Sequence, residues 1–478
     1  MRRVLLVFLA FVLALYLAFN LLQKGGNIPD IIQVPPGEQD SVEDISVVVD
    51  THSDTLTKML DDKTWLPSVD IGGDTTFDID IPKLKRGGVD VQYFAAFTSG
   101  YYANGKPDYP RSNSRLLAQM NALYWTIGNN SQHIGLAKSM EDISRLIESD
   151  KISAVLSIEG TYSIGDENGK KLLRQYHDLG VRAAGLVWNH SNALGEGVNG
   201  TYMYDMPSEG GLTELGREVV REMNRLGIII DVSHMNEETF WDVLEVSDAP
   251  IMASHSAAYG LRSHVRNLKD DQIRAIAKSG GVVGVVFYPE FLAEKGNKVS
   301  TQTIADHIEY IADLVGVEHV GIGSDFDGAG MPEDLKDASM IPRLERELEG
   351  RGFDRDDIEK IMGNNTMRVM EQVWGRYAAG EGRNNAPVIE PLIDMGQAVS
   401  GGHPVLAAVV KAAEGETIDP VSLGIIVDGR GYKPEFNQET GRMSLVLEET
   451  SDEKFHVVTF RAAVKGGGVS RETRIFRI

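Results

Sequence analysis

The chain contains no cysteine among its 478 residues. This absence excludes disulfide bonds, thiolate metal ligands, a cysteine nucleophile and a lipid anchor attached through cysteine. Positive charge is also scarce, because 47 lysines and arginines stand against 70 aspartates and glutamates, which gives a formal net charge of −23. A protein that binds nucleic acid needs a basic face to displace counterions, so we expect no nucleic-acid partner.

A long hydrophobic run stands at the amino terminus. Arg2 and Arg3 precede an uncharged, mostly apolar stretch over residues 4–22. As a helix this stretch would span on the order of 28 Å, close to the thickness of a membrane's hydrocarbon layer. It is longer than the apolar region of a secretory signal and has no clear Ala-x-Ala cleavage site.

We therefore expect residues 1–25 to form an uncleaved membrane anchor, with a cleaved signal segment as the alternative, followed by a linker over 26–44. The leading arginines keep the amino terminus in the cytoplasm, so the remainder would lie outside the cell membrane. The prediction is a single-pass, extracytoplasmic protein, or a secreted one if the segment is cleaved.

From residue 45 onward, short β-branched runs alternate with amphipathic stretches such as 212–226, 269–279 and 301–315. Apolar runs without two-residue alternation are typical of strands buried on both faces of a parallel sheet. The alternation predicts an α/β fold, a (β/α)₈ TIM-type barrel over 45–380, with a doubly wound sheet as the alternative. The eight expected strands are 45–50, 89–97, 152–158, 182–188, 227–233, 250–254, 281–288 and 319–324.

The pattern changes beyond the predicted barrel. Strand-like runs follow one another, with turn signals such as Asp428-Gly429 and Thr440-Gly441 between them. These features predict a small all-β sandwich over 386–478, which resembles the Ig-like domains appended to bacterial surface proteins. It offers no chemistry, so we expect a spacer or protein-contact role and a deletion that leaves turnover intact. The expected strands are 405–413, 422–428, 443–449, 455–464 and 472–478.

Histidines and acids stand at the carboxyl ends of the predicted barrel strands. In a barrel these ends meet at one face, where active sites of this architecture lie. Any single histidine there is more simply explained as a structural hydrogen-bonding residue, but the whole set at one end indicates a joint site. The residues are His52, Asp54, Glu159, His190, His234, His255 and Asp325.

The charges at this end predict bound cations. Asp54, Glu159 and Asp325 would sit together, with no lysine or arginine in their motifs. Two carboxylates about 4 Å apart repel by about 4 kcal/mol at an effective dielectric of 20. Either their pKa values rise or cations lie between them. Imidazole and carboxylate ligands without thiolate suit Zn²⁺, with Mn²⁺ or Co²⁺ as alternatives, and two divalent ions bring the local charge close to neutral.

These motifs resemble the membrane dipeptidase (renal dipeptidase) family, zinc enzymes of the amidohydrolase superfamily. The resemblance covers about residues 45–378, and the motifs come in the family's order. They are Asp-x-His-x-Asp (50–54), Ser-Ile-Glu-Gly (157–160), Trp-Asn-His (188–190), Asp-Val-Ser-His (231–234), Ser-His-Ser-Ala-Ala-Tyr (254–259), Arg-Asn-Leu-x-Asp-Asp (266–271) and Gly-x-Gly-Ser-Asp-Phe-Asp-Gly (321–328).

The resemblance implies two zinc ions per chain. One would be held by His52 and Asp54, and the other by His234 and His255. Glu159 would bridge both ions. A water between two zinc ions ionises near neutral pH, so the implied reaction is attack of this hydroxide on the amide bond of a dipeptide.

The resemblance also assigns residues to the substrate. His190 would contact the substrate or polarise its scissile carbonyl, and Arg266 would hold the substrate carboxylate as a planar fork. Asp325 would take the proton of the attacking water and pass it to the leaving amine. The implied substrates are dipeptides, including those with a D-residue at the carboxyl end.

The chain departs from the family pattern at a few positions. Thr51 and Ser53 stand where the family often has glycine and asparagine, and Thr161-Tyr162 where it often has Gly-His. Phe291 lies at a substrate-binding position near which some relatives place a tyrosine that binds the substrate carboxylate. A phenylalanine cannot donate that hydrogen bond. These departures concern substrate preference more than the metal site.

Two other functions remain open at this stage. The chain could be another metal-dependent amidohydrolase, acting on a lactam, lactone or cyclic amide, for which Arg266 would matter little. It could instead be a non-catalytic surface binding protein with an inactive barrel, which would bind little zinc. The sequence leaves the oligomeric state open, a homodimer included.

Overall fold

The computed structural model describes residues 47–100, 108–198, 210–378, 385–399, 403–448 and 452–478. The predicted anchor over 1–25 and the linker over 26–44 lie outside these residues. Within the described part of the chain, none of the helices combines the length and apolar character needed to span a bilayer.

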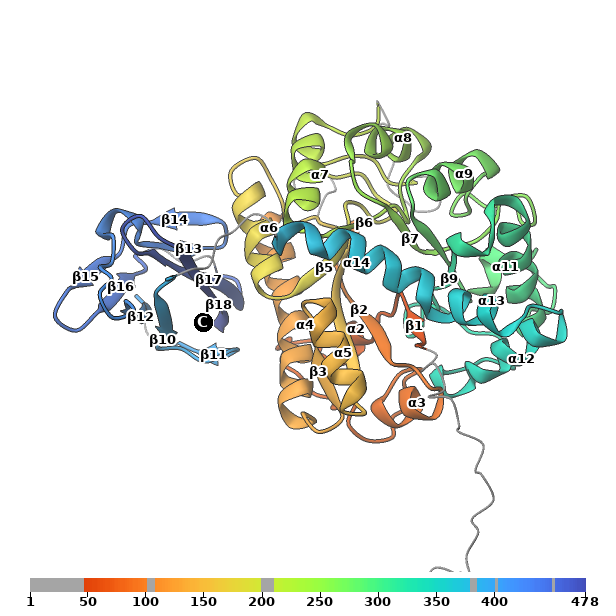
Figure 1. Cartoon of the computed structure of the whole chain (residues 1–478), viewed down its shortest axis with the longest axis horizontal. Coiled ribbons are helices and arrows are strands. Elements are labelled where there is room, and N and C mark those ends of the chain that lie inside the picture. The colour runs from red at the N-terminus through yellow and green to blue at the C-terminus, as the bar shows by residue number, and fades with distance from the viewer. Residues whose placement is uncertain (1–46, 101–107, 199–209, 379–384, 400–402, 449–451) are drawn as a thin grey trace, which may run out of the picture. The chain divides into compact units, whose positions relative to one another are not determined.

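Parallel strands close into a barrel, and helices surround it (Figure 1). In the described chain β1 lies between β2 and β9, and β2 pairs with β4 from Val91↔Ser153 to Phe97↔Glu159, which closes the ring. All eight predicted strands are present, so the barrel prediction is confirmed. The barrel strands are β1 Val49–Asp50, β2 Val91–Phe97, β4 Ile152–Glu159, β5 Val181–Gly185, β6 Ile229–Asp231, β7 Met252–Ser256, β8 Val282–Val285 and β9 Val320–Ile322.

One further strand, β3 Ile134–Leu136, pairs with the beginning of β4 outside the ring and was not predicted. Its three residues are too few for any hydrophobic periodicity to show. Because it pairs only with the first three residues of β4, it does not alter the face where the strands end.

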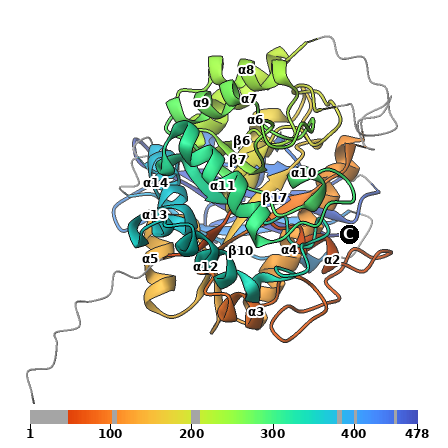
Figure 2. The same cartoon turned by 90° about the vertical axis from the view of Figure 1, so that its right-hand side faces the viewer.

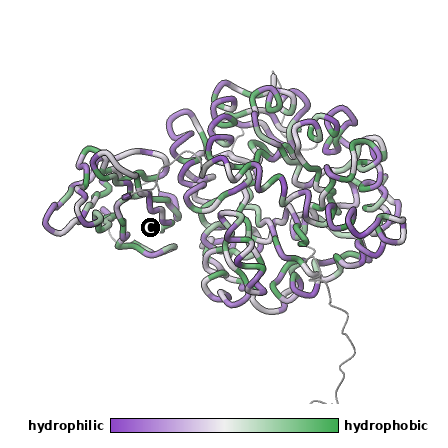
Figure 3. Tube along the Cα trace, viewed as in Figure 1, coloured by the Kyte–Doolittle hydropathy of each residue, from purple (hydrophilic) through white to green (hydrophobic). Residues whose placement is uncertain are grey.

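The helices bury their apolar faces against the barrel wall. In α7, the Thr213 side chain accepts a hydrogen bond from the backbone N–H of Gly216, and Gly227 ends the helix with φ of 69°. Hydrophobic residues gather inside the ring of helices and hydrophilic ones on its outside (Figure 3). Figure 2 shows the barrel from the side of α11.

The longer helices are α4 Tyr109–Asn129, α5 Met140–Glu148, α6 Gly169–Asp178, α7 Glu214–Leu226, α8 Glu237–Val246, α9 Asp270–Lys278, α11 Thr301–Val315, α12 Pro342–Gly350 and α14 Asn365–Ala378. The shorter ones are α2 Thr55–Lys58, α3 Ile81–Arg86, α10 Pro289–Leu292 and α13 Arg355–Glu359.

Residues 385–478, here called the C-terminal β region, form two sheets in their described part. One has the order β10-β12-β16-β15 and the other β11-β18-β17-β13-β14, with Leu406, Ile425 and Phe460 fully buried in their core. The all-β prediction is confirmed, although four short strands, β10, β11, β14 and β15, were missed. The strands are β10 Val388–Pro391, β11 Gln397–Ala398, β12 Val405–Lys411, β13 Gly424–Val427, β14 Arg430–Tyr432, β15 Glu435–Asn437, β16 Arg442–Val446, β17 Phe455–Ala463 and β18 Val469–Arg477. The Ig-like resemblance and the domain boundaries stay predictions.

We expect a buried histidine to make the stability of this region depend on pH. His456 Nδ1 lies 2.7 Å from Asp428 Oδ2, and its Nε2 lies 3.0 Å from the carbonyl oxygen of Glu453. Burial alone would lower the pKa of His456, but the Asp428 and Glu453 contacts outweigh burial and raise that pKa above its ordinary 6.5. A histidine whose pKa rises on folding stabilises the fold fully below its unfolded pKa, and this contribution is lost as pH rises through the folded pKa. The urea midpoint should therefore fall between about pH 6 and about pH 9.

The matched measurement uses a His456→Asn variant, which keeps a polar side chain but cannot titrate. Its urea midpoint should change less over the same pH range than that of the wild type. Equal pH dependence of the two proteins would contradict the assignment of this effect to the His456–Asp428 pair.

Candidate active site and metal centre

The predicted ligands lie together where the barrel strands end. His52 comes two residues after β1, and Glu159 is the last residue of β4. His52 Nε2 lies 3.8 Å from Asp54 Oδ2 and 3.8 Å from Glu159 Oε2. Because parallel strands of the barrel end at the same face, these residues come together, although more than a hundred positions separate Glu159 from the other two.

A second group faces the other oxygen of the same glutamate. Glu159 Oε1 lies 2.8 Å from His234 Nε2 and 3.6 Å from His255 Nε2. The two imidazole nitrogens are themselves 2.8 Å apart. Glu159 therefore turns one carboxylate oxygen toward His52 and the other toward the pair His234 and His255.

Asp325 completes the first group. Its Oδ1 lies 4.0 Å from His52 Nε2, and the residue has a φ of 63° in the turn that follows β9. A side chain at Gly328 would collide with the carboxylates of both Asp54 and Asp325, so only glycine allows this close approach of the backbone. One ligand atom each from His52, Asp54 and Asp325 lies within 4.8 Å of the others.

The charges in this site favour a cation. Burial raises the pKa of Glu159 well above its ordinary value, and the Asp54 carboxylate raises it further. Burial also raises the pKa of Asp325, against the opposing effect of His52. Burial alone would lower the pKa of His52, but the three neighbouring carboxylates raise it to about 10. The carboxylate cluster thus stabilises positive charge at its centre.

Hydrogen bonds fix which nitrogen of two histidines faces the centre. His234 Nδ1 lies 2.8 Å from Asn189 Oδ1, which can only accept, so this nitrogen carries the proton. Ser254 Oγ donates to Asp231 Oδ2 at 2.5 Å and lies 2.7 Å from His255 Nδ1, which therefore donates to it. Burial lowers the pKa of both histidines well below the ordinary value, so both rings are neutral. Each Nε2 then presents a lone pair toward the other and toward Glu159.

The residues present therefore fit divalent metal ions. Two lone-pair nitrogens and a carboxylate oxygen converge here, and a cation shared between them relieves that repulsion. Within the described residues, His52 Nε2 and Asp54 Oδ1 are buried and have no hydrogen-bond partner. Nitrogen and oxygen donors without sulfur suit Zn²⁺ and, less specifically, Mn²⁺ or Co²⁺.

Asn189, Asp231 and Ser254 belong to the sequence motifs, but no role was predicted for them. The available signal was their position, because each lies within three residues of a histidine in its motif and carries an oxygen able to orient an imidazole. Asp50 was missed in the same way. It is fully buried and accepts hydrogen bonds from the backbone N–H of Ser324 at 2.8 Å and from Gln92 Nε2 at 2.8 Å, which ties the turn after β9 to β1.

Replacing Asn189 with alanine should weaken metal binding. The change leaves the Nδ1 proton of His234 without its acceptor, so the ring loses its fixed orientation. Loss of such an outer hydrogen bond typically costs 10- to 100-fold in metal affinity, and we expect a loss of about that size here. Competition with a chelator of known affinity measures it. An Asn129→Ala variant on the surface of α4 serves as control, and equal affinity in both variants would contradict this role.

His190 lies beside the predicted metal ligands. It is buried, its ring centroid lies 5.7 Å from that of Trp188, and its backbone oxygen accepts a 2.5 Å hydrogen bond from the hydroxyl of Tyr162. A side chain at Gly100 would collide with the His190 ring, so the chain shortly after β2 packs directly on it. Burial lowers the pKa of His190, which keeps the ring neutral.

Arg266 and Phe291 stand on the other side of the site. Arg266 is buried, its Nη2 donates to the backbone oxygen of His255 at 3.1 Å, and its guanidinium lies 5.3 Å from the Phe291 ring centroid. A cavity of about 400 Å³ is lined by His234, Arg266 and Tyr259, among others. Phe291 therefore supports the guanidinium through a cation–π contact, an interaction that needs no hydroxyl.

Thr51 and Ser53, two further departures from the family pattern, make structural hydrogen bonds. Thr51 Oγ1 donates to the backbone oxygens of Ser254 at 2.5 Å and Ile322 at 2.9 Å, and Ser53 Oγ donates to that of Tyr93 at 2.8 Å. Both side chains thus tie the segment that follows β1 to other strands of the barrel.

Residues 38–379 match the profile of the membrane dipeptidase family, peptidase family M19. The chain belongs to this family. It is therefore a metallopeptidase of the dipeptidase type, as the motifs predicted. The dipeptidase aclJ of Aspergillus oryzae is 34% identical over 300 residues, which cover 62% of this chain and 70% of that protein.

Solved structures of this family share the barrel. The dipeptidase AC, a family M19 metallopeptidase, is 31% identical with a TM-score of 0.61 and covers 69% of this chain and 99% of its own. A metallopeptidase of Rhodobacter sphaeroides, bound to a phosphinate mimic of the dipeptide L-Ala-D-Ala, is 29% identical with the same TM-score and the same coverages. The C-terminal β region of this M19 dipeptidase lies beyond the segment that matches the family.

Proposed function

We propose that this family member hydrolyses dipeptides with two zinc ions that share Glu159. The single observation that supports the proposal best is the division of the Glu159 carboxylate, whose Oε2 lies 3.8 Å from His52 Nε2 and whose Oε1 lies 2.8 Å from His234 Nε2. His52 and Asp54 would hold one ion, and His234 and His255 the other. When bound, such ions lower the pKa of a water and polarise a carbonyl.

The chain's own side chains would supply the rest of the reaction. Asp325, whose carboxylate lies next to His52 and Asp54, would accept a proton and return it to the leaving amine. Neutral His190 would donate a hydrogen bond to the scissile carbonyl as charge develops on its oxygen. Arg266, buried beside His255, would bind the substrate carboxylate and place the amide bond over the centre.

The proposed substrates are free dipeptides, including those with a D-residue at the carboxyl end. The Rhodobacter sphaeroides relative was solved with a mimic of L-Ala-D-Ala, which supports this choice. A single buried arginine at the site would select a terminal carboxylate. A lactone or cyclic amide has no such group, so Arg266 also distinguishes the dipeptidase from another amidohydrolase.

A dipeptide library assayed with and without a chelator tests the proposal. We expect hydrolysis of free dipeptides that stops on chelation and returns when zinc is added back. Dipeptide amides, which lack the carboxylate, should be poor substrates under the same conditions. Activity unaffected by thorough metal removal, or hydrolysis of lactones in preference to dipeptides, would contradict the proposal.

We further propose that residues 1–25 anchor the chain in the cell membrane with the barrel outside. The supporting observation is the uncharged apolar run over 4–22 behind Arg2 and Arg3. Fractionation of cells that express the full chain tests this. The protein should stay with the membranes after a high-salt wash, and recovery in the medium would show cleavage and release.

A further inference from the structure

The C-terminal β region is held against the barrel through buried polar contacts. Ser46–Ile478 form one compact unit. Gln175 on α6 is fully buried, and its Nε2 lies 3.1 Å from the backbone oxygen of Ile426 and 3.1 Å from Thr459 Oγ1. Its Oε1 accepts a 2.7 Å hydrogen bond from the backbone N–H of Gly429. Because a buried amide needs hydrogen-bond partners, these contacts with β13, β17 and the turn after β13 indicate that α6 and the C-terminal β region pack together specifically.

The turn between β13 and β14, Asp428-Gly429, touches the loop that follows the bridging glutamate. This loop, residues 160–168, connects Glu159 to α6. A Cβ added at Gly429 would lie 2.6 Å from Asn168 Cβ, which leaves no space for a larger side chain. Gly429 also has a φ of 81°, a backbone conformation that other residues adopt only with strain. The Asn168 side chain binds the loop in turn, since its Oδ1 accepts from the backbone N–H of Gly165 at 3.0 Å and its Nδ2 donates to the oxygen of Ser163 at 3.2 Å.

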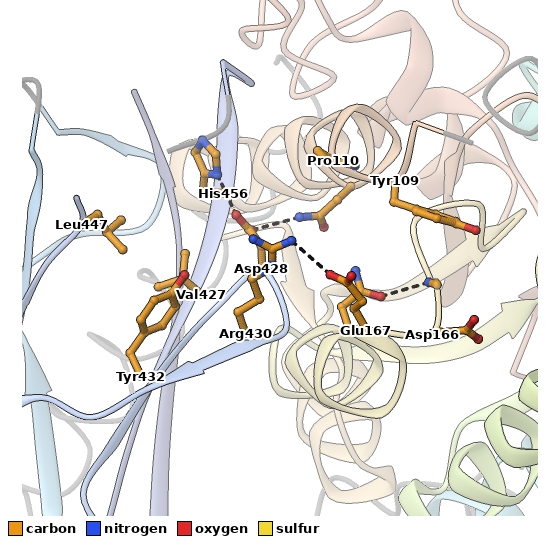
Figure 4. A pocket seen from close by; sticks show the side chains of 13 residues that line it. Tyr109, Pro110, Asp166, Glu167, Val427, Asp428, Arg430, Tyr432, Leu447 and His456 are labelled. Carbon is orange, nitrogen blue, oxygen red and sulfur yellow. Dashed lines mark hydrogen bonds and ion pairs between the residues drawn. The ribbon is translucent and has the colours of Figure 1, made fainter. Parts of the chain in front are cut away.

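A second path joins the same turn to the same loop. Asp428 Oδ1 accepts a 2.9 Å hydrogen bond from Asn113 Nδ2, while Asp428 Oδ2 binds His456. The Tyr176 hydroxyl lies within 2.8 Å of both Asn113 Oδ1 and Ser163 Oγ. Figure 4 shows Asp428 between His456 and the barrel helices. Buried side chains therefore link the β13–β14 turn to Ser163 without a gap.

The loop carries the residue that holds His190. Tyr162, next to Ser163, is buried, and its hydroxyl donates to the backbone oxygen of His190 and accepts from the backbone N–H of Trp188 at 3.1 Å. Both ends of the Trp-Asn-His motif are thus fixed by one hydroxyl group.

We propose that the C-terminal β region is a positioning element of the active site, whose Asp428-Gly429 turn holds the 160–168 loop and, through the Tyr162 hydroxyl, the backbone of His190. This inference rests on the proposed function, because it assigns the region an effect on dipeptide hydrolysis. It reverses the expectation that the region is only a spacer. Tyr162 is a positioning residue here, since it acts through His190.

The first test compares two glycine-to-alanine variants of the full chain. Gly429→Ala should push the turn away from Asn168, whereas Gly466→Ala places an alanine at a similar φ of 74° with nothing within 4 Å of its Cβ. Small displacements of a catalytic group can cost up to about 100-fold, and we expect roughly a tenfold lower kcat for Gly429→Ala with KM and bound zinc unchanged. Gly466→Ala should keep the wild-type kcat, although it too places an alanine in the left-handed region. A wild-type kcat in a folded Gly429→Ala enzyme would overturn the inference.

The second test removes only one hydroxyl. Tyr162→Phe should also lower kcat by roughly tenfold without loss of zinc. Tyr124→Phe is the matched control, because the Tyr124 hydroxyl donates to the backbone oxygen of Leu179 at 2.7 Å, before β5 begins and away from the site. The double variant Gly429→Ala/Tyr162→Phe should lose no more kcat than Tyr162→Phe alone, because both changes act on the same backbone.

The outcomes separate the two proposals. A wild-type enzyme that holds zinc but hydrolyses no dipeptide would refute the proposed function. An active wild type together with additive losses in the double variant, or with equal effects of Tyr162→Phe and Tyr124→Phe, would refute the positioning role alone.

Discussion

Glu159→Gln is expected to lose both bound zinc and dipeptide hydrolysis. Glutamine keeps one carbonyl oxygen but replaces the other with an amide nitrogen that cannot ligate a metal, so one of the two groups of ligands loses its shared oxygen. We expect the zinc content to fall by at least one ion per chain and kcat/KM to fall by more than about 100-fold, the upper end of what loss of outer support alone costs. Elemental analysis of the purified protein and a dipeptide assay measure both effects.

The control for this variant is Glu345→Gln. Glu345 is partly buried on α12 and burial raises its pKa, but it lies outside the cluster of ligands. Its substitution should leave zinc content and turnover at wild-type levels. A Glu159→Gln protein that retains two zinc ions would contradict the bridging role of this carboxylate.

Arg266→Met is expected to impair the hydrolysis of free dipeptides far more than that of other amides. Methionine keeps much of the side-chain volume over Phe291 but removes the charge that would pair with the substrate carboxylate. Hydrogen bonds to charged groups contribute roughly 2–3 kcal/mol, which corresponds to a loss of about 30- to 150-fold in kcat/KM for a dipeptide. The corresponding dipeptide amide, already a poor substrate, should be affected only slightly.

The comparison of the two substrates makes this prediction specific. Arg262→Met is the control, because Arg262 pairs with the exposed Glu294 instead of lining the cavity. It should leave both substrates unaffected. Equal losses of kcat/KM for the dipeptide and its amide in Arg266→Met would show that Arg266 supports the fold of the site and does not bind the substrate carboxylate.

The barrel, and the clustering of the predicted ligands at one of its ends, could be predicted from sequence for a topological reason. Parallel strands end at one face, so residues such as His52 and His255 must meet there once their strands are placed. The shortest strands could not be predicted from the sequence. β3 and β14 have three residues each, and the burial of β14 does not alternate, so no periodic signal marks them.

The supporting contacts of the site were harder to predict. Asn113 and Gln175 look like ordinary polar positions on helices, and their partners in the C-terminal β region depend on how the sheets meet the barrel. Tyr162 was noticed only as a departure from the family pattern. Its hydroxyl bonds Trp188 and His190 because the segment after β4 lies next to the segment after β5. This contact between distant segments leaves no local pattern in the sequence.

The central claim is that two divalent ions share one glutamate between separate groups of ligands. Anomalous diffraction at the zinc edge, from crystals of the full-length enzyme loaded with zinc, tests it most directly. The account predicts two peaks, one beside His52 and Asp54 and one beside His234 and His255, each about 2.0–2.2 Å from a different oxygen of Glu159. A single peak, or peaks that do not touch Glu159, would contradict it.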